Sequence, residues 1–492
     1  MEKKLLTFDY GASSGRGILG RFDGESLQIS EVHRFANEPV FAFGHYYWDV
    51  LRLFHELKQG MIKTAREGHR DIASIGVDTW GVDFALLDED GLMLGNPFYY
   101  RDSLTNGEME RVFEVVPKKE LYDRTGLQFL KFNTLFQLTA IKRTYPALLE
   151  RAKTLLFMPD LFNYMLTGEK SAEFSIASTS QMLDVHKGDW DRELLEKLGI
   201  PLSILSPVLL PGQILGQTTE QIAEETGIYS LVSAVCGHDT GSAVLAVPME
   251  KGEKAAYLSC GTWSLLGVEL DSPQTSEKAF AAEYTNEGGF GKTIRFLKNI
   301  MGLWIYQEVK REYERDFGAV SYAELDAAIA KAPAFQSFID PDAPEFMDKG
   351  QMTARIQAYC RKTNQPVPEG IGPLLRCVLE SLAMKYRYAI TALEDILGEK
   401  LPVLRVVGGG CKDELLLTYT ANATNRQVIA GPVEATAIGN LCVQLIALTE
   451  VDGIWQAREL ASKSFETKTY LPRETSAWET AYGVFLEKTN LI

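Results

Sequence analysis

The segment that most constrains the fold is the beginning of the chain, residues 4–20. It consists of an apolar stretch that ends at Asp9, a short turn rich in glycine and serine at residues 11–15, and a second apolar stretch. Such a turn lets the backbone approach a phosphoryl group, and its amides and hydroxyls can bind phosphate oxygens. The carboxylate before the turn can attract a metal ion. The segment therefore indicates a nucleotide-dependent phosphotransferase, although ordinary β-turns have a similar composition.

A related pattern returns about half a chain later, at residues 255–269. An apolar stretch is again followed by a small polar turn, which contains Gly261, Thr262 and Ser264, and by a second apolar stretch. Two hairpins of this kind predict an internal duplication in which a phosphate is held from two sides. A coincidental β-hairpin is the alternative interpretation.

The length and the order of the periodic segments predict two α/β domains. A chain of 492 residues exceeds what one hydrophobic core usually supports. Strand and helix patterns alternate from the start, which is typical of layered α/β domains. The strands are expected at residues 4–9, 15–22, 27–34 and 72–78, and a helix at 48–68. We predict an N-terminal domain over residues 1–245, with a mostly helical insertion at 105–225, and a C-terminal domain over 246–492.

Charge and composition exclude several classes of partner. The chain carries 50 Lys and Arg against 66 Asp and Glu, a net charge of −16, which disfavours nucleic acid. No apolar run approaches the roughly 20 residues that span a bilayer, and no signal peptide is evident, so we expect a cytoplasmic protein without a membrane partner. The six cysteines form no Cys-x-x-Cys pair, which disfavours zinc, and pairing of Cys360 with Cys377 stays open. A monomer and a small homo-oligomer are both compatible with this composition.

A run of three glycines, Gly408 to Gly410, lies between a predicted strand and a predicted helix. Bare backbone at the start of a helix can accommodate a nucleotide base or ribose. A dinucleotide-binding fingerprint would require glycine or alanine at Asp413, so the run disfavours a dinucleotide-dependent oxidoreductase. A structural turn between strand and helix is the alternative.

Asp239 lies at a predicted junction of strand and helix, within the sequence His238-Asp239-Thr240. Phosphoryl transfer to a hydroxyl needs a base beside the attacking oxygen, and a carboxylate at such a junction meets this requirement. The alternative is that Asp239 only caps the helix.

Residues 76–84 place two acids, Asp78 and Asp83, close to Thr79 and Trp80 at the end of a predicted strand. Polar groups beside an aromatic face suit a polyhydroxylated ligand. The alternative is that the tryptophan belongs to the hydrophobic core.

Taken together, these collinear motifs resemble the FGGY family of carbohydrate kinases over nearly the whole chain. The resemblance rests on residues 9–16, 78–83, 237–240, 259–264, 297–304 and 407–411. Within the family, DTWGVDF at 78–84 and KNIMGLW at 298–304 favour the branch that phosphorylates L-rhamnulose over those acting on xylulose, glycerol or L-fuculose.

The resemblance implies two actin-like ATPase (ribonuclease H-like) domains with an interdomain cleft. The N-terminal domain would hold sugar and phosphate, and the C-terminal domain the nucleotide. The implied activity is ATP-dependent phosphorylation of L-rhamnulose at O1, giving ADP, in L-rhamnose catabolism. Another ketose kinase of the family, acting on L-fuculose or xylulose, and a non-catalytic sugar sensor stay as alternatives.

Site residues are implied by the same resemblance. ATP would contact Ala12, Ser13, Ser14, Gly15, Arg16, Thr262, Gln307, Gly409 and Gly410. The ketose would contact Gly81, His238, Asp239, Thr240 and Asn299, with Asp239 as the catalytic base. Asp9 would hold Mg²⁺ directly or through water. The chain departs from the family pattern at Tyr10, where leucine is commoner, and at Cys260, where serine is frequent.

Overall fold

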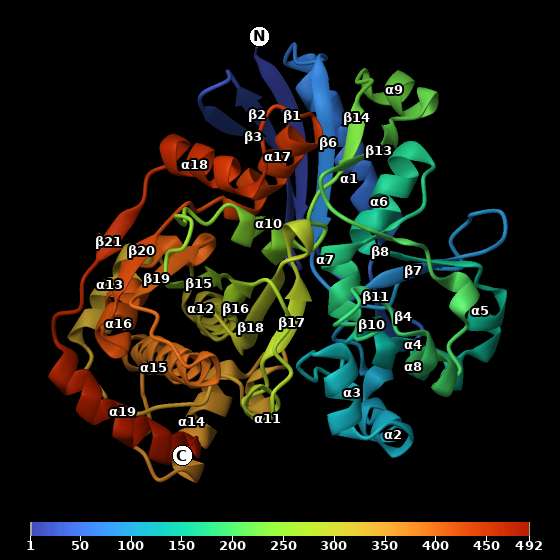
Figure 1. Cartoon of the computed structure of the whole chain (residues 1–492). Helices are drawn as coiled ribbons and strands as arrows, with labels where there is room; N and C mark the ends of the chain where they lie inside the picture. Colours follow the sequence, from blue (N-terminus) through green and yellow to red (C-terminus); the bar gives the residue numbers. More distant parts are fainter. Residues whose placement is uncertain (1, 492) are drawn as a thin grey trace. The chain divides into compact units, whose positions relative to one another are not determined.

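The structure, a computed structural model, describes residues 2–491 (Figure 1). The chain divides into two compact units. Unit 1 comprises the chain through Lys251 together with Glu269–Leu297 and Glu434–Phe465. Unit 2 comprises Gly252–Val268, Lys298–Val433 and the chain from Glu466 onward. Both units are therefore assembled from segments that are far apart in the sequence.

The first sheet has six strands in the order β13-β14-β6-β1-β2-β3. Strands β1, β2 and β3 form an antiparallel meander, while β6 is parallel to β1 and β14 is parallel to β6. The bounds are β1 Lys3–Tyr10, β2 Ser14–Phe22, β3 Leu27–Ala36, β6 Ile72–Thr79, β13 Gln213–Gln217 and β14 Leu231–Ala234. All four strands expected in this region are confirmed.

The second sheet has seven strands in the order β17-β18-β16-β15-β19-β20-β21. Like β1 and β2, strands β15 and β16 form an antiparallel hairpin, and β15 then pairs in parallel with β19, as β1 does with β6. The bounds are β15 Ala255–Cys260, β16 Trp263–Leu270, β17 Thr285–Gly288, β18 Ile294–Met301, β19 Val403–Val407, β20 Gln427–Ala430 and β21 Lys468–Tyr470. The repeated order agrees with an internal duplication.

Helices cover the first sheet on the sides where its strands are apolar. The helix expected at 48–68 is α1, Val50–Arg66, and the Asp49 side chain caps it by accepting from the amide of Arg52 at 3.2 Å. Helix α17, Ala435–Ala447, packs against β1, β6 and β14, and it also contacts α10, Asp239–Leu245. Helix α18, Ile454–Ser464, contacts α17, and helix α6, Met158–Thr167, contacts β6, β13 and β14.

The segment predicted as a helical insertion has its own apolar core around Leu138, Phe136 and Phe157. Besides α6, its helices are α2 Glu108–Val115, α3 Lys118–Thr125, α4 Thr134–Thr144, α5 Pro146–Arg151, α7 Phe174–Ala177, α8 Arg192–Lys197 and α9 Glu220–Thr226. It also contains short strands that the sequence analysis missed, because they are too short to show alternation: β8 Thr154–Phe157, β9 Ala172–Glu173, β10 Leu183–Asp184, β11 Asp189–Trp190 and β12 Val208–Leu209.

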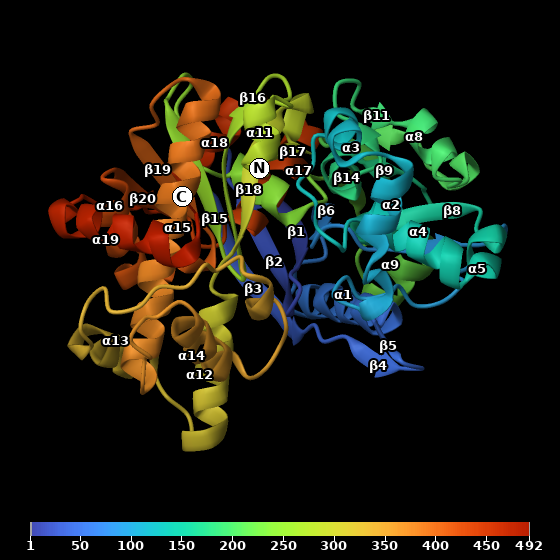
Figure 2. The ribbon, with the colours of Figure 1, turned by 90° about the horizontal axis from the view of Figure 1, so that it is seen from below.

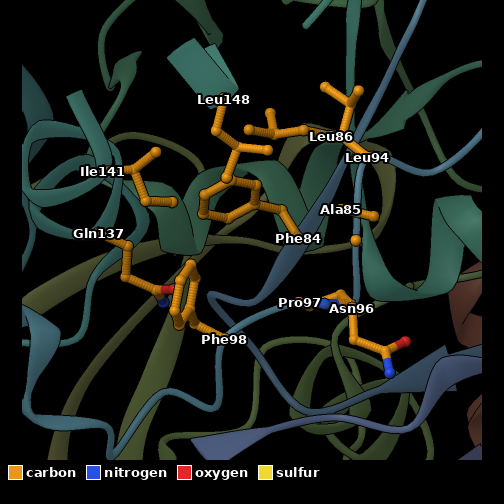
Figure 3. Close-up of a pocket in the computed structure, with 11 residues that line it drawn as sticks. Phe84, Ala85, Leu86, Leu94, Asn96, Pro97, Phe98, Gln137, Ile141 and Leu148 are labelled. Carbon is orange, nitrogen blue, oxygen red and sulfur yellow. The ribbon is translucent and has the colours of Figure 1, made fainter. Parts of the chain in front are cut away.

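A mostly apolar pocket opens in this part of unit 1, between Phe84, Phe98 and Leu148 (Figure 3). None of the predicted site residues lines it. The nearby strands are β7, Phe84–Leu87, and the small hairpin of β4, Val40–Ala42, and β5, His45–Tyr47.

In unit 2 the helices gather around α15, Ile371–Leu397, which contacts α12, α13 and α16. Figure 2 shows α12, α13 and α14 at one end of this long helix. The bounds are α11 Glu277–Ala281 in unit 1 and, in unit 2, α12 Trp304–Phe317, α13 Tyr322–Lys331, α14 Met352–Lys362, α16 Glu414–Thr424 and α19 Thr475–Thr489.

All six cysteines, including Cys360 and Cys377, are free thiols. Within residues 2–491, no helix combines the length and the apolar character that a membrane span requires.

Candidate active site

Predicted site residues of unit 1 lie at the edge of the first sheet where the parallel strands end. The Trp80 amide donates to the Tyr10 carbonyl at 3.1 Å, and the Thr79 amide donates to the Gly237 carbonyl at 2.8 Å. These bonds bring the ends of β1 and β6 together with the segment that follows β14. The carboxyl ends of parallel strands are where ligands bind in open α/β sheets.

The first turn holds its shape through backbone contacts. The Gly11 amide donates to the Ser14 carbonyl at 2.9 Å, and the Asn37 side chain donates to the Gly11 carbonyl at 2.8 Å. Within the described part of the chain, the amides of Ala12 and Ser13 donate to no protein group. Backbone N–H groups that donate to no protein group can bind an anion, so an anion-binding role of this turn stays a prediction.

Asp9 and Arg16 form an ion pair across the hairpin, and Arg16 also pairs with Glu434, just before α17. The Asp9 side chain is only 5% exposed. Burial lowers the pKa of Arg16, but the two carboxylates outweigh this and raise it overall. Arg16 is therefore charged, and it joins the hairpin to the start of α17.

Asp78 lies beside Asp9 in the parallel register and is fully buried. The side-chain amide of Asn440 donates to Asp78 Oδ2 at 2.5 Å, while Asp78 Oδ1 has no partner among the described residues. Burial raises the pKa of Asp78 well above its usual range, and the charges of Asp9 and Asp239 raise it further.

Asp9, Asp78 and Asp239 thus form a group of carboxylates whose charges oppose one another. Within residues 2–491, no three histidine, cysteine, aspartate or glutamate side chains lie close enough to hold a metal by themselves. Mg²⁺ does not need such a set, because it usually keeps several waters and takes one or two carboxylates together with phosphate oxygens. The excess negative charge and the unpartnered Asp78 oxygen fit a hard divalent cation.

Asp239 is the first residue of α10, and its side chain is 29% exposed. One of its oxygens accepts from the amide and the hydroxyl of Thr240, at 2.6 and 3.1 Å. His238, rather than Asp239, occupies the N-cap position, so the capping alternative does not describe Asp239. Burial raises the pKa of Asp239; His238 lowers it, and Asp9 raises it further.

Gly81 faces the imidazole of His238. A Cβ atom on Gly81 would lie 3.3 Å from His238 Nε2 and 3.5 Å from the Thr179 side chain. His238 Nε2 in turn lies 3.4 Å from Asp239 Oδ1. Because glycine has no side chain, position 81 leaves space beside the imidazole of His238 and the carboxylate of Asp239. The structure thus brings four of the predicted residues together: Gly81, His238, Asp239 and Thr240.

The interpretation of Trp80 and Asp83 as ligand-binding groups is not supported. Asp83 is fully buried and accepts from the indole nitrogens of Trp48 and Trp80 at 2.5 and 2.9 Å, and from Gln137 at 2.9 Å. Trp80 is only 5% exposed and packs against Trp48. Burial raises the pKa of Asp83 to about 7, although its donors act in the opposite direction. Both residues therefore belong to the buried core of unit 1.

We expect Asp83→Asn to destabilise unit 1. Asparagine keeps only one acceptor oxygen, and its NH₂ group would face either the two indole N–H groups or Gln137 Nε2, so that donor meets donor on one side. An unsatisfied buried donor costs about 1–3 kcal/mol. Thermal and urea denaturation measure the change, with Asp90→Asn at an exposed turn as the control. Equal stability of the two variants would contradict the role assigned to Asp83.

Unit 2 carries the remaining predicted residues. Thr262 lies in the turn between β15 and β16, and its carbonyl accepts from the amide of Gly302 at 3.1 Å. A Cβ on Gly302 would clash with the hairpin at 2.7 Å, so glycine is required for this close approach. Asn299 lies on β18 and Gln307 on α12, and both side chains are partly exposed.

The triple glycine packs over the end of β15. A Cβ on Gly410 would lie 2.3 Å from the sulfur of Cys260, and one on Gly408 would lie 3.0 Å from the Cys260 carbonyl. Gly409 is exposed, with no atom within 4 Å of an added Cβ. Bare backbone is therefore presented at Gly409, at the start of the short 3-10 helix η6 Gly409–Lys412.

Sequence reasoning missed several residues that shape the unit 1 site. Asn440 and Gln444 are polar positions four residues apart in the otherwise apolar helix α17, and Arg295 is a single charge in the apolar start of β18. The signal that could have found them is a polar residue within an apolar pattern. Such a residue is expected to be buried, but the sequence does not show which group it bonds.

Two family models match the chain. The N-terminal domain of the FGGY family of carbohydrate kinases matches residues 4–246, and the C-terminal domain matches residues 256–448. The chain belongs to the FGGY family of carbohydrate kinases. It is therefore a sugar kinase, with ATP as co-substrate, and the family assignment made from its motifs is confirmed.

Curated relatives cover almost the full length. The chain is 42% identical over 483 residues to a rhamnulokinase of Bacteroides thetaiotaomicron, covering 98% of each chain. It is 43% identical over 466 residues to a rhamnulokinase of Halalkalibacterium halodurans, covering 95% of this chain and 98% of the relative.

Solved structures show the same fold at lower identity. A gluconate kinase of Lactobacillus acidophilus matches with a TM-score of 0.82 at 15% identity, covering 100% of this chain and 98% of that one. A Plasmodium falciparum glycerol kinase with ADP matches with a TM-score of 0.77 at 16% identity, covering 99% of this chain and 98% of that one. The predicted fold class, actin-like ATPase domains of α/β type, is confirmed.

Proposed function

We propose that the chain is a rhamnulokinase, which transfers the γ-phosphoryl group of ATP to O1 of L-rhamnulose and releases ADP and L-rhamnulose 1-phosphate. The observation that carries this proposal is the identity of 42–43% to rhamnulokinases over nearly the whole chain. The geometry of unit 1 supports it, because a partly exposed carboxylate lies beside an imidazole and an open glycine position.

In this mechanism Asp239 accepts the proton of the attacking hydroxyl. Its partial exposure leaves room for a sugar oxygen, and its contact with Thr240 fixes the direction of the carboxylate. Gly81, His238, Thr240 and Asn299 are proposed to bind the ketose. Base catalysis of this kind is worth roughly 10²–10⁴-fold.

The proposal assigns ATP-binding roles to residues of each hairpin. Residues 12–16 of the first turn bind phosphate oxygens through backbone amides, serine hydroxyls and the Arg16 guanidinium. Thr262, Gln307, Gly409 and Gly410 bind the nucleotide from unit 2. Asp9 would hold Mg²⁺ directly or through water. When bound, this ion neutralises charge on the transferring phosphoryl group.

The proposal also covers the location, the partners and the domain bounds of the chain. We place the protein in the cytoplasm, as a monomer or small homo-oligomer without nucleic-acid or membrane partners, and we keep residues 1–245 and 246–492 as its two domains. The net charge of −16 supports the exclusion of nucleic acid.

An ADP-release assay with L-rhamnulose, L-fuculose, D-xylulose and glycerol tests the substrate. We expect the highest kcat/KM with L-rhamnulose and no turnover when a chelator removes Mg²⁺, because the clustered carboxylates and the phosphates need a counter-charge. Higher kcat/KM with another acceptor would overturn the substrate assignment. ATP binding without turnover on any acceptor would favour the sugar sensor.

A further inference from the structure

Arg295 is a buried cation that the proposed mechanism does not use. It lies on β18 and is fully inaccessible to solvent. Its Nε donates to the Gly288 carbonyl at 2.8 Å, and its Nη2 lies 3.2 Å from Glu287 Oε2. A fully buried charge is costly unless it is paired and hydrogen-bonded, and Glu287 supplies the opposite charge.

The same guanidinium nitrogen donates to Nδ1 of His238 at 3.1 Å. Because a guanidinium has only donors, a hydrogen bond at this distance makes Nδ1 the acceptor, and the neutral imidazole then carries its proton on Nε2. Glu287 Oε2 also lies 3.3 Å from Nδ1 and would accept from an Nδ1–H in the other tautomer. The same oxygen lies 3.2 Å from Arg295 Nη2, and this ion pair leaves the guanidinium as the donor toward Nδ1.

His238 Nε2 faces the open part of the site. It lies 3.4 Å from Asp239 Oδ1 and 3.3 Å from the position that a Cβ on Gly81 would occupy. An N–H at this nitrogen can donate to a sugar hydroxyl or carbonyl oxygen next to the catalytic base. In the other tautomer Nε2 would be an acceptor, and it could not donate this bond.

We propose that Arg295 is a positioning residue, which fixes His238 as the Nε2–H tautomer so that the imidazole donates a hydrogen bond to an oxygen of the ketose. Glu287 holds the guanidinium in place. The part of this inference that concerns the ketose rests on the proposed function, whereas the tautomer concerns this chain alone.

Nitrogen-15 NMR of histidine-labelled protein tests the tautomer directly. The chain has six histidines, and the signal that disappears in His238→Asn identifies His238. We expect the wild type to show a protonated Nε2 and a bare Nδ1, and Arg295→Met to lose this signature. A wild-type spectrum with the proton on Nδ1 overturns the proposal, and this measurement needs no folded variant of Arg295.

Steady-state kinetics test the consequence. Loss of one positioned hydrogen bond predicts a KM for the ketose raised about ten-fold in Arg295→Met, with the KM for ATP little changed. Adding Glu287→Gln to Arg295→Met removes the buried charge and places an amide donor near Nδ1, so we expect partial recovery of ketose KM. Equal changes in both KM values, without recovery, would show a merely structural role and overturn the proposal.

Arg458→Met is the matched control. Arg458 is also a buried arginine paired with a glutamate, Glu269, but it bonds the carbonyls at the far end of α10. We expect it to lower thermal stability without changing the His238 signal. If the wild type phosphorylates no ketose while His238 shows the Nε2–H form, the proposed function fails and the tautomer assignment stands.

Discussion

Replacement of Asp239 by asparagine is expected to lower kcat for ketose phosphorylation by about 10²–10⁴-fold, the usual contribution of general base catalysis. Asparagine keeps the size of the side chain and can still accept from the Thr240 amide, so α10 should keep its start. It cannot take up a proton at the pH of the assay. The ADP-release assay measures kcat, and calorimetry measures ATP and ketose binding, which should change little.

The exposed turn variant Asp90→Asn serves as the control for this substitution. An Asp239→Asn enzyme with kcat close to that of the wild type would remove Asp239 from the mechanism. Loss of binding together with kcat would instead assign Asp239 a role in holding the sugar.

The environment of Asp239 also determines how its activity depends on pH. Burial and the charge of Asp9 raise its pKa above the usual range of aspartate, against the opposing effect of His238. A base must be deprotonated to act, so activity falls as the pH drops through this raised pKa. The acid limb of the pH profile should therefore lie at higher pH than for an unperturbed aspartate and be absent in Asp239→Asn.

Much of the site could be predicted because it lies in local patterns. The turn after Asp9, the turn around Thr262 and the strand–helix junction at Asp239 each combine a periodic apolar segment with glycine or polar residues. Such combinations indicate both a backbone shape and a chemistry. The strands of the first sheet that were expected from this pattern are present.

What could not be predicted depends on contacts between distant segments. Asp78 meets Asn440 across 362 positions, and Arg16 meets Glu434 across 418. Nothing in the local sequence of either partner specifies the other. The position of Trp80 could not be predicted either. The local sequence around an aromatic residue at the end of a strand is the same whether the ring faces a ligand or the core.

Replacement of glycine by alanine inside a helix normally raises stability. Gly439→Ala is nevertheless expected to be strongly destabilising. A Cβ on Gly439 in α17 would lie 1.8 Å from the backbone carbonyl oxygen of Ser242 in α10. Backbone atoms cannot rotate away as a side chain can, so α10 and α17 must separate. Overpacking of this kind costs about 1–3 kcal/mol and occasionally more. Since Asp239 is the first residue of α10, kcat should fall as well.

Gly483→Ala is the control, because Gly483 also lies inside a helix and the opposite effect on stability is expected there. Gly483 is an exposed residue inside α19, with no atom within 4 Å of an added Cβ. Alanine there should leave stability unchanged or raise it by up to about 1 kcal/mol, because it has the higher helix propensity. Thermal denaturation and the ADP-release assay compare the two variants. If Gly439→Ala matched Gly483→Ala in both, close packing of α17 on α10 would not be what holds the catalytic carboxylate in place.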